Sequence, residues 1–360
     1  MAIKAELQAL ADSAHYTARL VFTSRAAQTQ RAKVHRSVLR LLGFLLLVVG
    51  AATLFEWALQ TGFRRVKTSD FGIMNLVANG KADADIVVSG SSRALTHYDS
   101  AAIGAITGLK TLNIGLNGTQ TDVQAAYLRV YLRNNRKPAL VIHNLDPYAF
   151  QISHEIYDVV KFMPYLNQPE LYSVVKRVYP SAWKWRLIPL YGFFVEDLRY
   201  TWLLGVRGLL GMHPAEDRIL GFQGRQTVWT GDFDKFRESV KGGVTLGIVD
   251  QGVRDLADIA KACQEHAVPL LLVYSPEYHE MQALERDRRE VFAHFHKIAA
   301  ERSATVWDYS DSPLCRDQSL FYNSQHLNAT GARAFSEDLA HRLVRLPILA
   351  GKVRDGRTPP

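Results

Sequence analysis

Five short apolar runs recur along the chain, and each ends in small or polar residues. The runs cover residues 86–89, 111–115, 139–145, 268–274 and 305–309. Four stretches with helical periodicity accompany them, at about 122–133, 249–266, 281–303 and 329–346. Runs that are apolar throughout indicate strands buried on both faces, and their alternation with helices favours a parallel sheet with right-handed crossovers. The pattern predicts an α/β fold with a doubly wound, parallel five-stranded sheet. It also places the charged residues 286–290 on the outer, solvated face of the third helix.

A longer apolar stretch lies near the N-terminus, between Val38 and Leu59. A span of about 20 apolar residues is enough to cross a bilayer as a helix. Arg40 at one end and Trp57 at the other suit the two membrane interfaces. The alternative is a buried helix of a soluble protein, which is rarely apolar on all sides over such a length. We therefore predict a transmembrane helix over residues 37–60.

The flanks of this helix predict its orientation and the domain boundaries. Residues 1–36 carry more basic than acidic side chains, which predicts a cytoplasmic N-terminus, although Arg64, Arg65 and Lys67 on the other side weaken the asymmetry. A signal peptide is not expected, because the apolar core begins late and no small-residue cleavage site follows it. The expected protein is a single-pass inner-membrane protein with its bulk in the periplasm. We expect a linker over 61–84, in which residues 64–84 could also form a short helix, the α/β domain over 85–347 and a disordered tail over 348–360.

The strand and helix rhythm is interrupted between residues 148 and 245. This insertion is rich in tyrosine, proline and tryptophan, including Trp183, Trp185 and Trp202. One interpretation is a helical cap packed on the sheet. The other is a face that docks on the membrane or on a membrane protein, since tryptophan, tyrosine and arginine suit both kinds of surface.

Composition narrows the possible partners. The 360-residue chain has a net charge of +8, which suits nucleic acid, anionic lipid or a polyanionic glycan. No zinc-finger spacing or RNA-binding aromatic block is present in the sequence, so we do not expect a nucleic-acid partner. Cys263 and Cys315 do not form a disulfide framework, and no cysteine and histidine cluster has metal-ligand spacing. We expect neither a metal ion nor a cofactor.

Candidate chemistry begins where the first strand ends, at Ser89-Gly90-Ser91-Ser92. Gly90 permits a sharp turn, and a serine there would lie at the C-terminal edge of the sheet, where open α/β sheets bind ligands. The alternative is that these serines only cap the next helix. More than two hundred residues later, His326 lies in a polar loop before the last helix. A neutral imidazole there could take the proton of a serine hydroxyl.

These two motifs together resemble the SGNH (GDSL-like) hydrolase superfamily. Gly90-Ser91-Ser92 is similar to its nucleophile block, and Gln325-His326-Leu327-Asn328 with Gly331-Ala332 is similar to its histidine block in membrane-tethered members. Those members include the D-alanyl-transfer protein of teichoic acids and the alginate O-acetylation proteins. The resemblance covers about residues 83–345 and implies an SGNH/flavodoxin-like fold, with Ser92 as nucleophile and His326 as base.

The resemblance also implies an oxyanion hole and a third catalytic residue. The amide of Ser92, the amide of Gly118 and the side chain of Asn144 are the implied oxyanion donors. The family has an aspartate three residues before the histidine, whereas this chain has Asn323. An amide can orient the imidazole but cannot neutralise its positive charge. A Ser92–His326 pair could act alone, or a carboxylate at Asp308 or Asp317 could replace the aspartate.

Three functions follow as hypotheses. The first is a membrane-anchored acyl or acetyl transferase or esterase that acts on a cell-envelope glycan or exopolysaccharide through an acyl-serine. The second is a noncatalytic partner of a membrane-bound O-acyltransferase or of a polysaccharide assembly and export complex. The third is a structural anchor or assembly protein. Asn323 is the feature that keeps the second hypothesis open.

Overall fold

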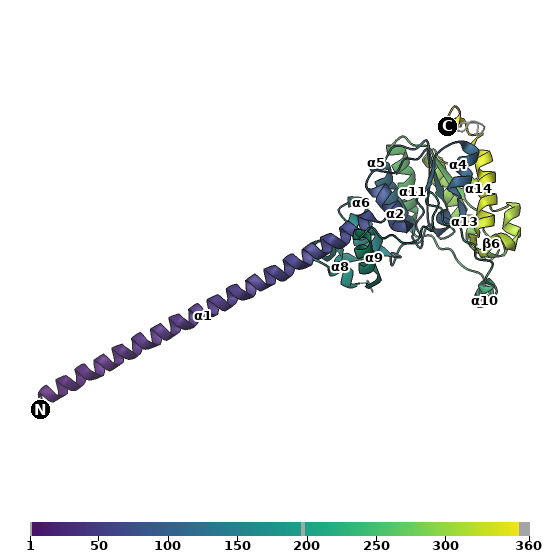
Figure 1. Cartoon of the computed structure of the whole chain (residues 1–360). Helices are drawn as coiled ribbons and strands as arrows, with labels where there is room; N and C mark the ends of the chain where they lie inside the picture. Colours follow the sequence, from purple (N-terminus) through teal and green to yellow (C-terminus); the bar gives the residue numbers. More distant parts are fainter. Residues whose placement is uncertain (1, 196–198, 353–360) are drawn as a thin grey trace. The chain divides into compact units, whose positions relative to one another are not determined.

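The computed structural model describes residues 2–195 and 199–352, which divide into two units that meet between Trp57 and Ala58 (Figure 1). The first unit consists of helix α1, which spans Ala2–Arg65 and continues into the second unit. The second unit holds the sheet and all other helices of the described chain.

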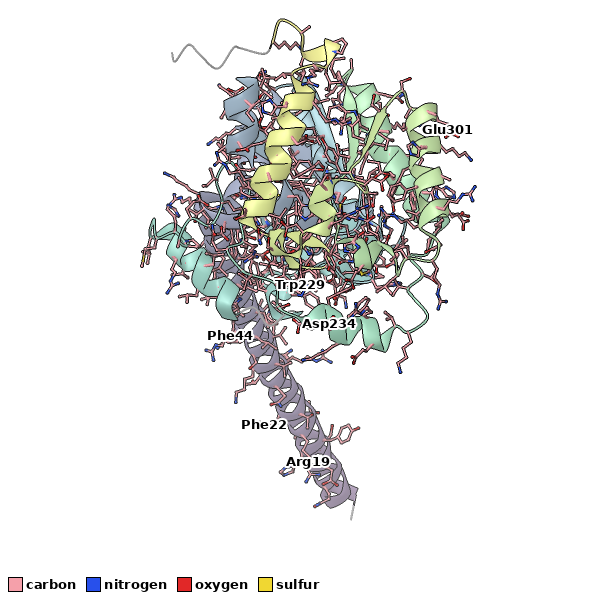
Figure 2. All side chains as sticks on the ribbon, turned by 90° about the vertical axis from the view of Figure 1, so that its right-hand side faces the viewer. Arg19, Phe22, Phe44, Trp229, Asp234 and Glu301 are labelled. Carbon is pink, nitrogen blue, oxygen red and sulfur yellow. The ribbon has the colours of Figure 1, made fainter. Side chains whose placement is uncertain are left out.

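Helix α1 contains a stretch, Gln28–Arg65, that is long and apolar enough to span a membrane. The most apolar 18-residue window of this stretch has no buried residue. Leu46 and Leu47 are about 70% exposed, and the side chains of Phe22 and Phe44 project from the helix (Figure 2). This exposure is unlike that of a core helix in a soluble protein, whose apolar side chains are covered by other elements.

The sheet has the predicted class. Its strands are β1 (Ile86–Ser89), β2 (Thr111–Asn113), β3 (Leu140–Asn144), β4 (Leu270–Tyr274) and β5 (Thr305–Asp308). Their order is β2-β1-β3-β4-β5, and every pair is parallel. This is the flavodoxin-like order, in which ligands bind beyond the carboxyl ends of the strands, where β1 and β3 diverge. The three central strands, β1, β3 and β4, follow the buried apolar runs because a parallel sheet covered on both faces excludes most polar side chains.

Helices cover both faces of the sheet (Figure 1). Helices α5 (Thr121–Asn134), α11 (Asp250–Glu265) and α13 (Arg288–Glu301) pack on one face. Helices α3 (Ser92–His97), α4 (Ser100–Thr107) and α14 (Ala329–Leu343) pack on the other. Each face encloses its own apolar cluster, so the sheet is the central layer of three.

The helix expected over 281–303 is wrong as a single element. The chain forms α12 (His279–Gln282) and then α13, with a break around Asp287. The Asp287 carboxylate accepts hydrogen bonds from the amides of Leu246 and Gly247 at 2.7 and 2.9 Å. Arg288, expected on the solvated face, instead turns inward to Glu285 and Tyr274. Tertiary partners of these two residues therefore break the helix, while Arg286, Arg289 and Glu290 are exposed as expected.

The segment expected as a linker, 61–84, holds the end of α1 and helix α2 (Ser69–Ala78). Phe71, Met74 and Val77 of α2 are buried against the core. At the other end of the chain, Pro347–Leu349 forms a 3-10 turn with Leu349 buried, and residues 353–360 of the expected tail lie outside the described residues.

The insertion is mostly helical. Its elements are η1 (Val159–Tyr165), α6 (Pro169–Val178), η2 (Pro180–Ala182), α7 (Trp183–Leu187), α8 (Tyr191–Val195), α9 (Arg199–Leu209) and α10 (Asp232–Ser239). Helices α8 and α9 lie beside the C-terminal end of α1 (Figure 1). There Gly62 of α1 meets Gly205 and Gly208 of α9, and a Cβ on Gly62 would lie 1.8 Å from the Gly205 carbonyl oxygen. The two helices can approach this closely because small residues occupy the contact.

Gly62→Ala is expected to lower the free energy of unfolding of the α/β unit by about 1–3 kcal/mol, because the added methyl group must push α9 away from α1. The measurement is thermal or urea unfolding of the detergent-solubilised chain followed by circular dichroism. Gly50→Ala is the matched control, since a Cβ at Gly50 meets nothing within 4 Å. Equal stability of the two variants would contradict the close α1–α9 contact.

Candidate active site

The turn after β1 separates the roles of its two serines. Gly90 has a φ of +143°, and a Cβ there would lie 2.8 Å from the Ala94 Cβ, so glycine is needed. The Ser91 hydroxyl oxygen caps α3 by accepting the Arg93 amide at 3.2 Å. Ser92 is therefore not the cap, and its hydroxyl is free to interact elsewhere.

The loop that carries His326 folds into a small antiparallel hairpin, which the sequence did not predict. Its strands are β6 (Phe321–Asn323) and β7 (His326–Leu327), and Asn323 pairs with His326 across it. Asn328 then caps α14 through the Gly331 amide. The hairpin places Asn323, three residues before His326, directly beside the imidazole ring.

Ser92, His326 and Asn323 form a continuous hydrogen-bonded relay. The Ser92 Oγ lies 2.8 Å from His326 Nε2, and His326 Nδ1 lies 2.9 Å from Asn323 Oδ1. The backbone amides of Gln325 and His326 also donate to Asn323 Oδ1, at 3.0 and 2.9 Å. An atom that accepts two amide hydrogens is the oxygen of the asparagine, so Nδ1 of His326 carries the proton. Nε2 is then the acceptor, and the Ser92 hydroxyl donates to it.

Two rings hold the His326 imidazole in place. Tyr322 stacks on it with ring centroids 5.3 Å apart, and His97 meets it edge-on at 6.0 Å. His97 Nε2 accepts the Leu327 amide at 3.0 Å, which ties α3 to the hairpin. His97 is buried and also positions the base, but its spacing in the sequence gives no sign of that contact.

A cavity of about 230 Å³ opens beside the relay. Its walls include Ser92, Arg93, Gly118, Asp146 and His326. Gly118 has a φ of +63°, and no hydrogen bond joins its amide to another residue of the described chain. The cavity is small compared with typical ligand sites of about 300–1,000 Å³, which suits a short acyl group beside the serine.

Asn144, the third implied oxyanion donor, does not line this cavity. Its Nδ2 donates to the Leu145 carbonyl and to the Asp146 carboxylate at 3.2 and 3.0 Å, and its Oδ1 accepts the Tyr98 hydroxyl. Both of its amide hydrogens are thus engaged. In this arrangement Asn144 orients Asp146, which does line the cavity.

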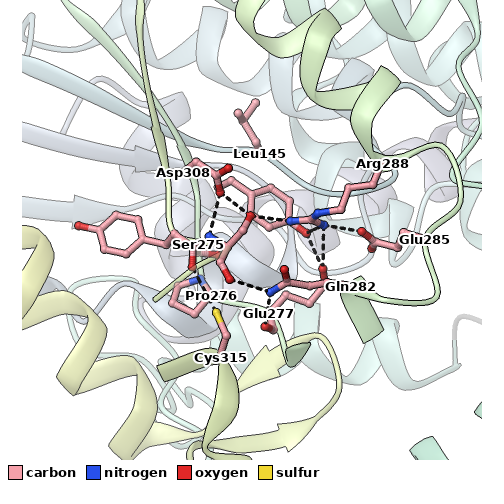
Figure 3. A network of polar contacts seen from close by, with 12 residues as sticks. Leu145, Ser275, Pro276, Glu277, Gln282, Glu285, Arg288, Asp308 and Cys315 are labelled. Atoms are coloured by element: carbon pink, nitrogen blue, oxygen red, sulfur yellow. Dashed lines mark hydrogen bonds and ion pairs between the residues drawn. The ribbon is translucent and has the colours of Figure 1, made fainter. Parts of the chain in front are cut away.

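Neither carboxylate considered as a replacement contacts His326. Asp317 caps a short helix through the Ser319 amide. Asp308, which is exposed, binds the Ser310 amide and hydroxyl at the edge of a network around Arg288 (Figure 3). That network also contacts the site, because the ring of Tyr274 packs against the guanidinium groups of both Arg288 and Arg93.

Positive charge surrounds the histidine. Burial, together with the nearby guanidinium groups of Arg93 and Arg225, lowers the pKa of His326 to about 3. Arg93 is itself buried and donates to the Ser275 carbonyl oxygen at 2.5 Å. The imidazole is therefore neutral at physiological pH and able to accept a proton, but the imidazolium that results is poorly stabilised.

Two further features bear on the chemistry. Within residues 2–195 and 199–352, no group of three histidine, cysteine, aspartate or glutamate side chains is placed to hold a metal ion. Cys263 and Cys315 are both free and buried.

Comparisons with known proteins add little to this geometry. No protein-family model matches the chain. No curated protein matches it either. Among solved structures, a protein from Bacteroides fragilis, provisionally described as an acylhydrolase, aligns with 8% identity and a TM-score of 0.30 over 72% of this chain and 88% of its own. An overlap this loose supports no conclusion about function, so the fold class rests on the sheet order and the site on its own geometry.

Proposed function

We propose that this chain is a membrane-anchored, extracytoplasmic serine acyltransferase or esterase that acts on a cell-envelope glycan or exopolysaccharide. The observation that carries the proposal is the Ser92–His326–Asn323 relay at the C-terminal edge of a parallel sheet, beside a small cavity. A hydroxyl, a base and a group that orients the base are what nucleophilic catalysis by serine requires. The resemblance of the two motifs to SGNH hydrolases points the same way.

The acylation step follows from the relay. The Ser92 Oγ attacks the carbonyl carbon of an acyl ester while its proton passes to His326 Nε2. The carbonyl oxygen becomes an oxyanion, which the amides of Ser92 and Gly118 are proposed to bind. Collapse of this intermediate breaks the bond to the leaving alcohol, which takes the proton from His326. Ser92 is left as an acyl ester.

The second half-reaction transfers the acyl group. A hydroxyl group gives its proton to His326 Nε2, attacks the acyl carbon and releases Ser92 with its proton restored. Water as the attacking group gives hydrolysis, and a sugar hydroxyl gives transfer. We propose a short acyl group such as acetyl, because the cavity beside Ser92 is small, at about 230 Å³. The resemblance suggests a membrane-bound O-acyltransferase as the partner that supplies it.

The test is covalent labelling of the full chain. A serine-directed fluorophosphonate and an activated acetyl ester should each modify Ser92, and peptide mass mapping locates the label. Ser92 is expected to react because its hydroxyl already donates to a neutral imidazole. A folded protein that never reacts with either reagent would rule out the catalytic proposal.

A noncatalytic partner of an O-acyltransferase or a polysaccharide export complex is the second candidate. Asn323 favours it, because an amide leaves the imidazolium of His326 uncompensated while burial, Arg93 and Arg225 disfavour that charge. This candidate predicts that the protein binds the glycan or the acyltransferase without labelling at Ser92. The same labelling experiment therefore separates the two candidates.

Membrane anchoring by α1 is proposed from its exposed apolar surface, with the N-terminus in the cytoplasm and the second unit in the periplasm. Reporter fusions after about residue 65 should be active only with an enzyme that works in the periplasm, such as alkaline phosphatase. A fusion to a cytoplasmic reporter at the same residue serves as the control. Activity of that control would overturn the topology.

A further inference from the structure

A groove of about 630 Å³ lies where α1 ends and meets α2 and α9, away from the relay. Its floor is apolar, with Val66, Leu76 and Leu209, and glycines in its wall leave it open. Leu76 remains 38% exposed although it belongs to a helix packed on the core. The volume is within the range of about 300–1,000 Å³ that small-molecule sites have.

The charges of this groove all have one sign. Arg64, Arg65, Lys67 and Lys81 line it, together with His213, and no aspartate or glutamate is among its lining residues in the described chain. Arg64 is occupied in part, because its Nη2 donates to the Pro164 carbonyl oxygen at 2.5 Å. Arg65, Lys67 and Lys81 are exposed and form no ion pair with any residue of the described chain. Three unpaired cations over an apolar floor favour a ligand that is anionic at one end and apolar at the other.

Chain connectivity sets where this groove lies. Arg64 and Arg65 follow Trp57, at the end of the apolar stretch of α1, by seven and eight residues. At a rise of about 1.5 Å per helical residue, this places them within roughly 12 Å of the end of the span. If α1 spans the membrane as proposed, the groove opens at the level of the lipid headgroups.

The geometry points to a binding site for an anionic membrane phospholipid in this groove. The phosphate lies against Arg65, Lys67 and Lys81, and the start of one acyl chain lies on Leu76 and Leu209. The site does not depend on Ser92 or on any catalytic activity. The basic residues that follow the apolar stretch of α1 run against a simple pattern in which positive charge lies on the cytoplasmic side. The proposed site gives these residues a function in lipid recognition.

The test uses the full chain in a neutral detergent and native mass spectrometry of bound lipid, with phosphatidylglycerol compared with phosphatidylcholine. Wild type is expected to retain phosphatidylglycerol in preference to phosphatidylcholine. The triple variant Arg65→Gln, Lys67→Gln, Lys81→Gln should lose this preference by about fivefold for each cation removed. Arg64 is left unchanged because it also holds the Pro164 carbonyl.

The matched control removes the same charge elsewhere, with Lys235→Gln, Lys241→Gln and Lys297→Gln, which are exposed and do not line the groove. This control should bind lipid as wild type does. Labelling of Ser92 should be the same in all three proteins, so a failure of the catalytic proposal leaves this test intact. Three outcomes would overturn the lipid site: no headgroup preference in wild type, an equal loss in the control, or displacement of phosphatidylglycerol by millimolar inorganic phosphate. Loss of a dimer mass in the triple variant would instead identify a second copy of the chain as the occupant.

Discussion

His326→Ala is expected to slow phosphonate labelling of Ser92 by about 10²–10⁴-fold, and Ser92→Ala to abolish it. The hydroxyl donates to His326 Nε2 over 2.8 Å, and no other base contacts it in the described chain. Without the imidazole, the proton of Ser92 must pass to water, and the contribution of a positioned general base is lost. The measurement is the second-order rate of labelling at pH 7.5, with the label located by mass mapping.

Two control variants separate chemistry from folding. Ser91→Ala removes the neighbouring hydroxyl, which caps α3 and contacts Asp146 but takes no part in the relay, so it should cost about 1 kcal/mol of stability and leave labelling largely intact. His279→Ala removes an exposed histidine that takes no part in the relay. If His326→Ala folds like these controls and still labels at the wild-type rate, His326 is not the base.

The sheet could be predicted because its signal is local. A strand such as 86–89, apolar at every position up to its last residue, can be accommodated only inside a sheet covered on both faces, and Gly90 marks its end. The same holds for β4 and for the first three residues of β3. Strand β5 is only partly buried, yet Val306 and Trp307 between polar residues were enough to indicate it. The positions of Ser92 after β1 and of His326 before α14 could be predicted from the same local patterns.

The details that decide the chemistry depend on contacts between distant residues. The hairpin that brings Asn323 to the His326 ring has strands of only three and two residues, too short to show a strand pattern in the sequence. His97 positions this hairpin across 230 residues of sequence. Asp287 breaks a regular helical pattern because its partners, Leu246 and Gly247, come from a segment about 40 residues earlier in the chain. Local helix propensity does not reveal that contacts with distant residues override it.

Asn323→Asp is expected to accelerate Ser92 labelling by about tenfold. The hydrogen bond from His326 Nδ1 would become charge-assisted, which adds about 1–2 kcal/mol to the stabilisation of the imidazolium in the transition state. In serine proteases the reverse change costs about 10⁴-fold, largely through the wrong tautomer. Here Asn323 already enforces the right tautomer through its Oδ1, so only the charge is missing. No hydrogen bond of Asn323 Nδ2 to a described residue is lost on substitution.

The pH dependence of the labelling rate should also change in the aspartate variant. Wild-type His326, with its pKa lowered to about 3, is neutral across the physiological range, so the labelling rate should show no acid limb down to about pH 4. A carboxylate at 323 raises the pKa of the imidazole, so the variant should gain an acid limb that moves toward the ordinary histidine value. Asn323→Ala is the control, because it removes the acceptor of Nδ1 and of two backbone amides and should label more slowly than wild type. An aspartate variant with the wild-type rate and an unshifted profile would show that His326 does not act as a base through Asn323.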